Sequence, residues 1–203
     1  MILLSSAQTA YIVASVIAII IVIALLIILF IKNKYRPKHT RELTYLKLHH
    51  FCEANDYLLL NNYRINIDDS NIGIIDHIVI SNKFIVIIND FPISAVLSGD
   101  FSDDNLSIYD KNGGGTVVNP LNYNVNLAKR LALFNNLSQE LIRGIVVINS
   151  DSKINVTNNN AQFRIVRLSE LKKTIKQFDK VNVKKLKEDD VVRFINYLDK
   201  QNQ

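Results

Sequence analysis

Residues 73–99 read GIIDHIVISNKFIVIINDFPISAVLSG, and this stretch decides the fold. It contains two hydrophobic runs, Ile74–Ile80 and Phe84–Phe91, joined by a three-residue turn and followed by a third short apolar segment. Runs of this length, rich in β-branched residues and bounded by turn residues, predict β-strands. Because both runs are apolar almost throughout, we expect helices to cover both faces of the sheet that they form.

Asp76 and His77 are the only ionisable residues in the first of these strands. Burying a polar pair in an apolar strand is costly unless each group has a partner. The sequence therefore predicts that a site, active or vestigial, lies at Asp76 and His77.

The rest of the chain interleaves helices with strands, which predicts an α/β domain with a mixed central sheet flanked by helices. Expected helices lie at residues 42–55, 119–136, 169–178 and 186–198, and further strands at 57–67, 94–97, 106–109, 141–148 and 163–168. The glycine run at residues 112–115 is expected to be a flexible turn, because no lysine follows it and it opens no helix. Residues 151–160 are expected to form a polar loop.

Residues 10–31 contain no charge, no proline and no glycine. As a helix they would be about 33 Å long, enough to cross a hydrocarbon core of about 30 Å, so they predict a transmembrane helix. A cleaved signal peptide is the alternative, but it would require basic residues before the apolar run, a shorter run and a small-residue cleavage site. The sequence has none of these.

Five basic residues follow the span and none precedes it, which predicts that the domain lies in the cytoplasm and that the flank attracts anionic lipid. They are Lys32, Lys34, Arg36, Lys38 and Arg41. The expected organisation is an extracytoplasmic N-terminus at residues 1–9, a single-pass span at 10–31, a basic linker at 32–40 and a globular domain at 41–200.

The globular part carries little net charge. Residues 42–170 hold 10 basic and 14 acidic side chains, net −4, whereas residues 171–203 hold 9 and 5, net +4. A broad basic face for nucleic acid is therefore not expected on the main body of the domain. Cys52 is the single cysteine, which excludes an intramolecular disulfide, and no histidine pair has the spacing of a zinc site.

Several segments in a fixed order resemble the nuclease-related domain (NERD) family of the restriction-endonuclease-like superfamily. These are Glu42 at the start of a helix, IDHIVIS in the first strand, Gly99, the NPL opening of a helix at Asn119, the strand GIVVINS and the helix start RLSEL. The resemblance covers most of residues 41–198 and implies a restriction-endonuclease-like fold.

The family's chemistry, as the resemblance implies it, uses a strand aspartate followed one strand later by Glu-x-Lys to hold a divalent metal ion and activate water. Asp76 matches the aspartate and His77 the residue after it, but the Glu position is Asn89 and the Lys position is Phe91. Tyr123 stands where the family has a helix glutamine, and Arg41 where it has a glycine. We therefore expect a catalytically degenerate domain that acts as a binding or scaffold module.

The sequence leaves two alternative functions open. A metal-dependent nuclease would use Asp76, Glu42 and a displaced Asp90 with Mg²⁺ or Mn²⁺, although Asp90 should face away from Asn89 and Phe91 on its strand. A structural subunit of a membrane complex is the other alternative. No cofactor is expected unless the nuclease alternative holds, and the oligomeric state is not predicted.

The ligand of a binding module would be a protein partner or nucleic acid near the membrane. A nucleic-acid ligand would require basic side chains around Asp76. The candidates nearest in sequence are Lys83, Lys129 and Arg130.

Overall fold

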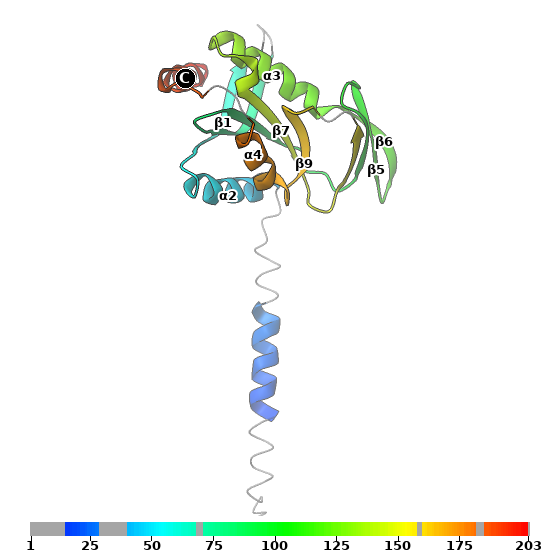
Figure 1. Cartoon of the computed structure of the whole chain (residues 1–203). Helices are drawn as coiled ribbons and strands as arrows, with labels where there is room; N and C mark the ends of the chain where they lie inside the picture. The colour runs from blue at the N-terminus through cyan, green and yellow to red at the C-terminus, as the bar shows by residue number, and fades with distance from the viewer. Residues whose placement is uncertain (1–14, 29–39, 68–70, 158–159, 182–184, 203) are drawn as a thin grey trace, which may run out of the picture. The chain divides into compact units, whose positions relative to one another are not determined.

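The computed structural model describes residues 15–28, 40–67, 71–157, 160–181 and 185–202 (Figure 1). The chain divides into two compact units, Met1–Lys38 and His39–Gln203. In the first unit, residues 15–28 form a helix with exposed side chains. The predicted N-terminal segment 1–9, the remainder of the predicted span and the linker residues 32–39, with Lys32, Lys34, Arg36 and Lys38, lie outside the described residues. Within the described ranges, no helix is both long and apolar enough to cross a membrane.

The second unit is built on a five-stranded sheet with the order β1-β2-β3-β7-β9. β1, β2 and β3 pair antiparallel, whereas β3, β7 and β9 pair parallel, so the predicted mixed sheet is confirmed. The strands are β1 (Leu58–Asn66), β2 (Ile72–Ile80), β3 (Ile85–Asp90), β7 (Ile142–Ile148) and β9 (Phe163–Arg167).

Four shorter strands form a second mixed sheet with the order β6-β5-β4-β8. They are β4 (Val96–Asp100), β5 (Asn105–Asp110), β6 (Gly113–Val118) and β8 (Lys153–Thr157). The prediction of a flexible turn at residues 112–115 is wrong, because Gly113–Gly115 pair with β5. A Cβ on Gly114 would lie 2.8 Å from the Tyr109 ring, so glycine permits this close strand packing. The loop predicted at 151–160 likewise contains a strand, β8, which pairs with β4.

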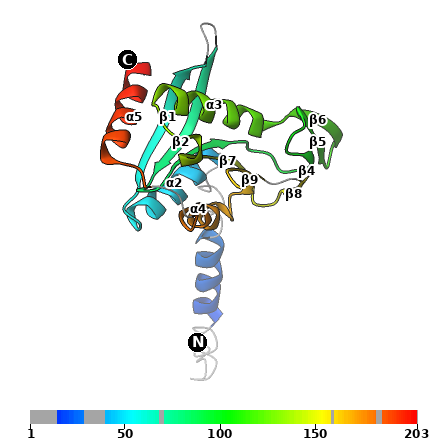
Figure 2. The same cartoon turned by 45° about the horizontal axis from the view of Figure 1, so that its top comes forward.

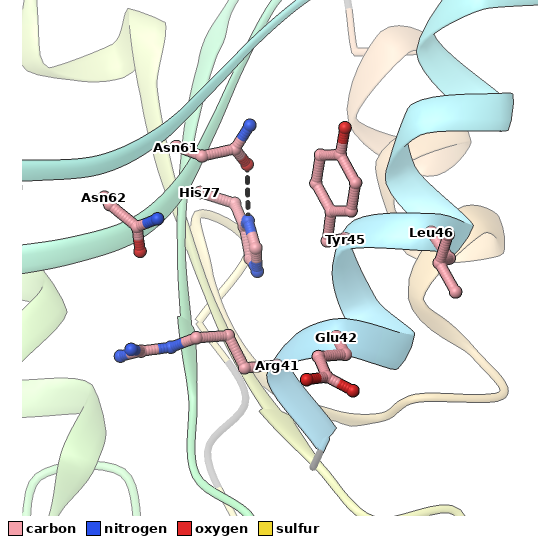
Figure 3. Close-up of a pocket in the computed structure, with 7 residues that line it drawn as sticks. All are labelled: Arg41, Glu42, Tyr45, Leu46, Asn61, Asn62 and His77. Atoms are coloured by element: carbon pink, nitrogen blue, oxygen red, sulfur yellow. Dashed lines mark hydrogen bonds between the residues drawn. The ribbon is translucent and has the colours of Figure 1, made fainter. Parts of the chain in front are cut away.

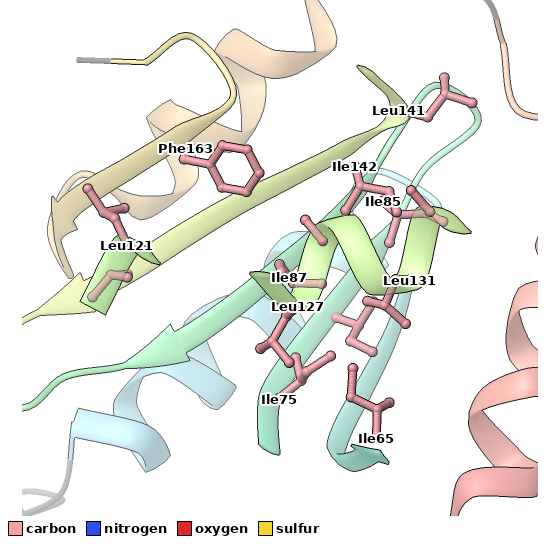
Figure 4. Packing of buried hydrophobic residues seen from close by; sticks show 14 of the residues in the cluster. Ile65, Ile75, Ile85, Ile87, Leu121, Leu127, Leu131, Leu141, Ile142 and Phe163 are labelled. Atoms are coloured by element: carbon pink, nitrogen blue, oxygen red, sulfur yellow. The ribbon is translucent and has the colours of Figure 1, made fainter. Parts of the chain in front are cut away.

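Helices cover the two faces of the five-stranded sheet (Figures 1 and 2). On one face, α3 packs over a core cluster that includes Ile85 and Ile87 (Figure 4). On the other face, α2 and α4 lie side by side over a second cluster that includes Val86 and Ile88. The helices are α2 (Thr40–Glu53), α3 (Pro120–Phe134), α4 (Leu171–Asp179) and α5 (Glu188–Gln201), the last of which contacts β1. Successive β3 residues thus enter opposite cores, as the alternation of a strand requires.

The NPL sequence has a clear structural role at the start of α3. The Asn119 side chain is fully buried and accepts a hydrogen bond from the Leu121 N–H at 3.0 Å, which caps the helix. Its amide also donates to the carbonyls of Phe101 and Asp103, between β4 and β5. Pro120 stands at the first helical position, where a missing N–H costs nothing. The motif therefore joins the helix to the second sheet.

Gly144 in β7 gives a test of core packing. A Cβ at this position would lie 2.4 Å from the Phe163 ring and 3.3 Å from the Asn124 side chain. We expect Gly144→Ala to lower the free energy of unfolding by about 1–3 kcal/mol through overpacking. Urea unfolding of residues 39–203, which hold every buried core residue, would measure it.

Gly115→Ala is the matched control, because its Cβ would have no neighbour closer than 3.8 Å. Its effect should stay within about 0.5 kcal/mol. Equal destabilisation by the two substitutions would contradict the packing at Gly144.

Candidate functional site

The site lies where β2 and β3 separate. The regular pairing of the two strands ends at His77 and Ile88. One residue earlier, the Asp76 carboxylate accepts the Asp90 backbone N–H through Oδ2 at 2.8 Å. A side chain therefore replaces the backbone acceptor that a continued ladder would have supplied.

Asp76 and His77 are consecutive, yet both contact or face α2. Asp76 bonds Arg41 in the first turn of α2, and His77 lines a hollow together with Arg41 and Tyr45 of the same helix. Successive side chains in a regular strand point to opposite faces. The alternation is interrupted at Asp76, which is why both polar residues reach one site.

Asp76 is 3% exposed and forms an ion pair with Arg41 from Oδ1 to Nη2. The sequence predicts Arg41 as the last residue of a lipid-facing basic flank, but the structure pairs its guanidinium with Asp76 instead. Carboxylate–guanidinium hydrogen bonds are among the stronger ones in proteins. With the Asp90 N–H on the other oxygen, the protein itself compensates the buried charge of Asp76.

Asp90 is the second carboxylate of the site, and its side chain is 3% exposed. The Thr44 hydroxyl of α2 donates to Asp90 Oδ1 at 2.6 Å, and His77 Nε2 lies 3.2 Å from Oδ2. The other ring nitrogen, Nδ1, lies 2.7 Å from the Asn61 side-chain oxygen in β1. The imidazole thus bridges Asn61 of β1 and Asp90 of β3 through its two ring nitrogens.

Asn89 and Phe91 flank Asp90 on the other side of β3. Phe91 packs against the core cluster beneath α3, so the position of the family's lysine is part of the hydrophobic core. The Asn89 amide donates to the Ile74 carbonyl at 2.8 Å. Asp90, which the sequence places on the opposite strand face from these two residues, is the one that joins Asp76 and His77.

Tyr123 of α3 also bonds to the backbone of β2. Its hydroxyl accepts from the Ile74 N–H at 2.6 Å and donates to the Ile74 carbonyl at 3.1 Å. Asn89 and Tyr123, at the family's glutamate and glutamine positions, thus satisfy the backbone of β2 where β3 has moved away. Both residues have a structural role here.

A hollow of about 570 Å³ opens beside the site, between α2 and β1–β2 (Figure 3). Its lining consists of Arg41, Glu42, Tyr45, Leu46, Asn61, Asn62 and His77. Glu42 is exposed and lies outside the two charge pairs, on the rim. Tyr45 and Leu46 are 39% and 45% exposed, so apolar surface borders the polar groups.

The three predicted nucleic-acid contacts do not gather at this site. Lys83 lies in the turn before β3, at the opposite end of the strand from Asp90, and donates to the Asp179 carbonyl at 2.7 Å. Lys129 and Arg130 belong to α3, on the opposite face of the sheet from α2. Arg130 donates to the Asn66 carbonyl at 3.3 Å and stacks over Phe134.

The donor set does not fit a divalent metal ion. Arg41 and a backbone N–H bond to the Asp76 oxygens, and Thr44 and His77 lie against those of Asp90. The Asn89 side-chain oxygen is buried without a partner, but it is neutral, and Mg²⁺ sites are built on carboxylates. Among the described residues, no three His, Cys, Asp or Glu side chains cluster in a way that would hold a metal.

Arg41, Thr44 and Asn61 are members of the site that sequence reasoning missed. Arg41 and Thr44 stand three residues apart in α2, and this spacing puts them on one helix face. Thr44 precedes Leu48 by four residues, which puts a polar residue on the apolar face of the helix, and this is the sequence signal that would have indicated a polar partner there. Asn61 carries no comparable signal in the sequence.

The fold and the site together define an α/β domain with a mixed central sheet and two buried carboxylates at the point where β2 and β3 separate. A comparison with protein-family models matches residues 38–149 to the nuclease-related domain, NERD. Because the match spans more than half of the 203 residues, the chain belongs to the NERD family. No match was found among curated proteins or among solved structures.

The Arg41–Asp76 pair is open to a double-mutant cycle. Arg41→Met should lower the free energy of unfolding by about 1–3 kcal/mol, because it leaves the buried carboxylate with one hydrogen bond fewer. Once Asp76→Asn has removed the charge, the same Arg41 substitution should cost less. Urea unfolding of residues 39–203 would measure all four proteins.

Arg167→Met is the control, since Arg167 pairs with Glu170 and both side chains are about 40% exposed. Exposed pairs of this kind add little to stability, so this substitution should leave the unfolding midpoint unchanged. If Arg41→Met lowered the free energy of unfolding no more than Arg167→Met does, the Arg41–Asp76 pair would not stabilise the site.

Proposed function

We propose that this NERD domain is a membrane-anchored module that binds a protein partner and does not hydrolyse nucleic acid. Residues 10–31 would be the single span, with the domain in the cytoplasm. The surface offered to the partner is the hollow beside Asp76 and the apolar rim of α2.

One observation carries the proposal: the protein's own groups compensate both buried carboxylates of the site. Arg41 forms an ion pair with Asp76, and His77 Nε2 lies 3.2 Å from Asp90 Oδ2. Metal-dependent hydrolysis needs carboxylates that are free to hold an ion, which then activates water and stabilises charge on the phosphate. Asn89 and Phe91 supply neither a second metal ligand nor a cation, and both are engaged elsewhere.

The rim of the hollow supports a protein partner in preference to nucleic acid. Leu43, Tyr45 and Leu46 in α2 are between 36% and 45% exposed, in a helix whose inner face is already packed. Exposed apolar side chains bordering polar groups are typical of protein-binding surfaces. Lys83, Lys129 and Arg130, the basic residues that a nucleic-acid site would need here, lie elsewhere on the domain.

The sequence of the first unit supports the anchor. Residues 10–31 are uncharged, and four basic residues of the same unit follow them, Lys32, Lys34, Arg36 and Lys38. That asymmetry favours retention of the following domain on the cytoplasmic side.

Hydrolysis is the first test. The full chain in detergent micelles should leave supercoiled DNA, single-stranded DNA and RNA intact in Mg²⁺ and in Mn²⁺, because no ion is held at Asp76. Gel electrophoresis of the nucleic acids over time would measure this. Cleavage that disappears in Asp76→Ala would overturn the proposal and establish a metal-dependent nuclease with a rebuilt site.

Membrane anchoring is a separate test. The full chain made with membranes should resist extraction at alkaline pH. Ile20→Asp combined with Ile23→Asp should release it, since each charge at mid-span raises the cost of insertion by about 2.5–3.5 kcal/mol. Leu133→Asp is the control, because it adds a charge to an exposed position of α3 and should leave the chain in the membrane fraction. Complete extraction of the parent chain would refute the anchor.

A further inference from the structure

A groove of about 440 Å³ lies between the C-terminal end of α2 and the outer side of α4. Its lining consists of Phe51, Lys172, Lys173, Lys176, Gln177 and Lys180. The five lining residues other than Phe51 belong to α4 and its C-cap, which follow the last residue matched by the family model.

The lysines of the groove share one side of α4. Lys173, Lys176 and Lys180 are exposed and follow one another at spacings of three and four residues, which places them on a single helix face. The Lys176 ammonium lies 5.9 Å from the centre of the Phe51 ring. The groove is thus lined by an aromatic ring and by lysine ammonium groups.

Nearby acidic groups do not balance this charge. The two acids that bound α4 have other partners, since Glu170 pairs with Arg167 and Asp179 with Lys83. Among the ion pairs of the described chain, none includes a lysine of the groove. Burial and the repulsion of Lys172 lower the pKa of neighbouring Lys47, whose ammonium donates to the Leu168 carbonyl at 2.7 Å. The groove therefore carries positive charge that no ion pair balances, and a bound anion would neutralise part of this charge.

The route of the chain indicates where that anion comes from. α2 and α4 cover the same face of the five-stranded sheet, and α2 begins at Thr40. If residues 10–31 span the membrane, residues 32–40 are the whole tether, which reaches at most about 30 Å when fully extended. The chain therefore enters the domain through the helical layer that carries the lysines, and a tether of this length would hold the domain near the lipid headgroups.

We propose that the groove between α2 and α4 binds the phosphate groups of anionic lipids and docks the domain on the bilayer by this face. The inference rests on the proposed membrane anchor. Each lysine near an anionic surface strengthens such binding by a factor of about five, and the contribution is lost as salt screens the charges.

Lysine acylation followed by mass spectrometry tests the docking on the full chain in lipid nanodiscs. In discs of phosphatidylcholine mixed with phosphatidylserine, acylation of Lys173, Lys176 and Lys180 should slow at least about threefold relative to phosphatidylcholine alone. The rates should recover at about 0.5 M salt. Lys111 and Lys153 in the second sheet are exposed controls whose rates should not change.

A charge-reversal variant tests the docking on lipid independently. Lys173→Glu, Lys176→Glu and Lys180→Glu together should abolish the slowing at Lys172, whereas Lys111→Glu with Lys153→Glu should leave it intact. All five positions are exposed, so neither variant disturbs the hydrophobic core.

The outcomes separate the two proposals. A chain that enters discs but shows equal lysine rates with and without phosphatidylserine overturns the docking and leaves the anchor in place. A chain that never enters discs overturns both. Slowing caused by an added single-stranded oligonucleotide in neutral discs, but not by phosphatidylserine, would also overturn the lipid assignment and identify the groove as a polynucleotide site.

Discussion

The ion pair between Arg41 and Asp76 is the contact on which the functional face of this domain depends. It fixes the first turn of α2 against the centre of the sheet, so that Thr44 reaches Asp90 and Tyr45 reaches the hollow. The same aspartate closes the end of the β2–β3 ladder by accepting a backbone N–H. One carboxylate therefore fixes both the helix and the point where the strands separate.

The second pair, His77 with Asp90, lies in the same small volume and is buried on both sides. Burying charges is favourable only when partners and hydrogen bonds replace the lost water. Here Asn61, Thr44 and a backbone amide complete the set. In this domain Arg41 lies against Asp76, and His77 lies against Asp90. Asn89 and Tyr123 bond to the backbone of β2, and Phe91 packs against the core beneath α3.

The strands within residues 73–99 were predicted correctly, because nearly continuous runs of isoleucine and valine favour buried β-strands over other structures. β6 and β8 escaped prediction for the opposite reason: glycine and polar residues there form strands only through pairing with β5 and β4. At the site, the spacing identified Asp76 and His77 but not their partners. Asp76 bonds to Arg41, 35 residues earlier, and no local pattern encodes such a contact. Arg41 itself resembled the basic flank that precedes it in the sequence.

The pairing of β4 with β8 has a consequence for how the domain assembles during synthesis. β4, β5 and β6 are neighbours in sequence and form an antiparallel meander through local pairing. β8 begins 53 residues after β4 ends, beyond α3 and β7, so one edge of β4 stays open until that length has been added. Long-range parallel pairing is slow, and open strand edges invite association with other chains. The strand that finally covers this edge, β8, therefore protects the nascent sheet from such association.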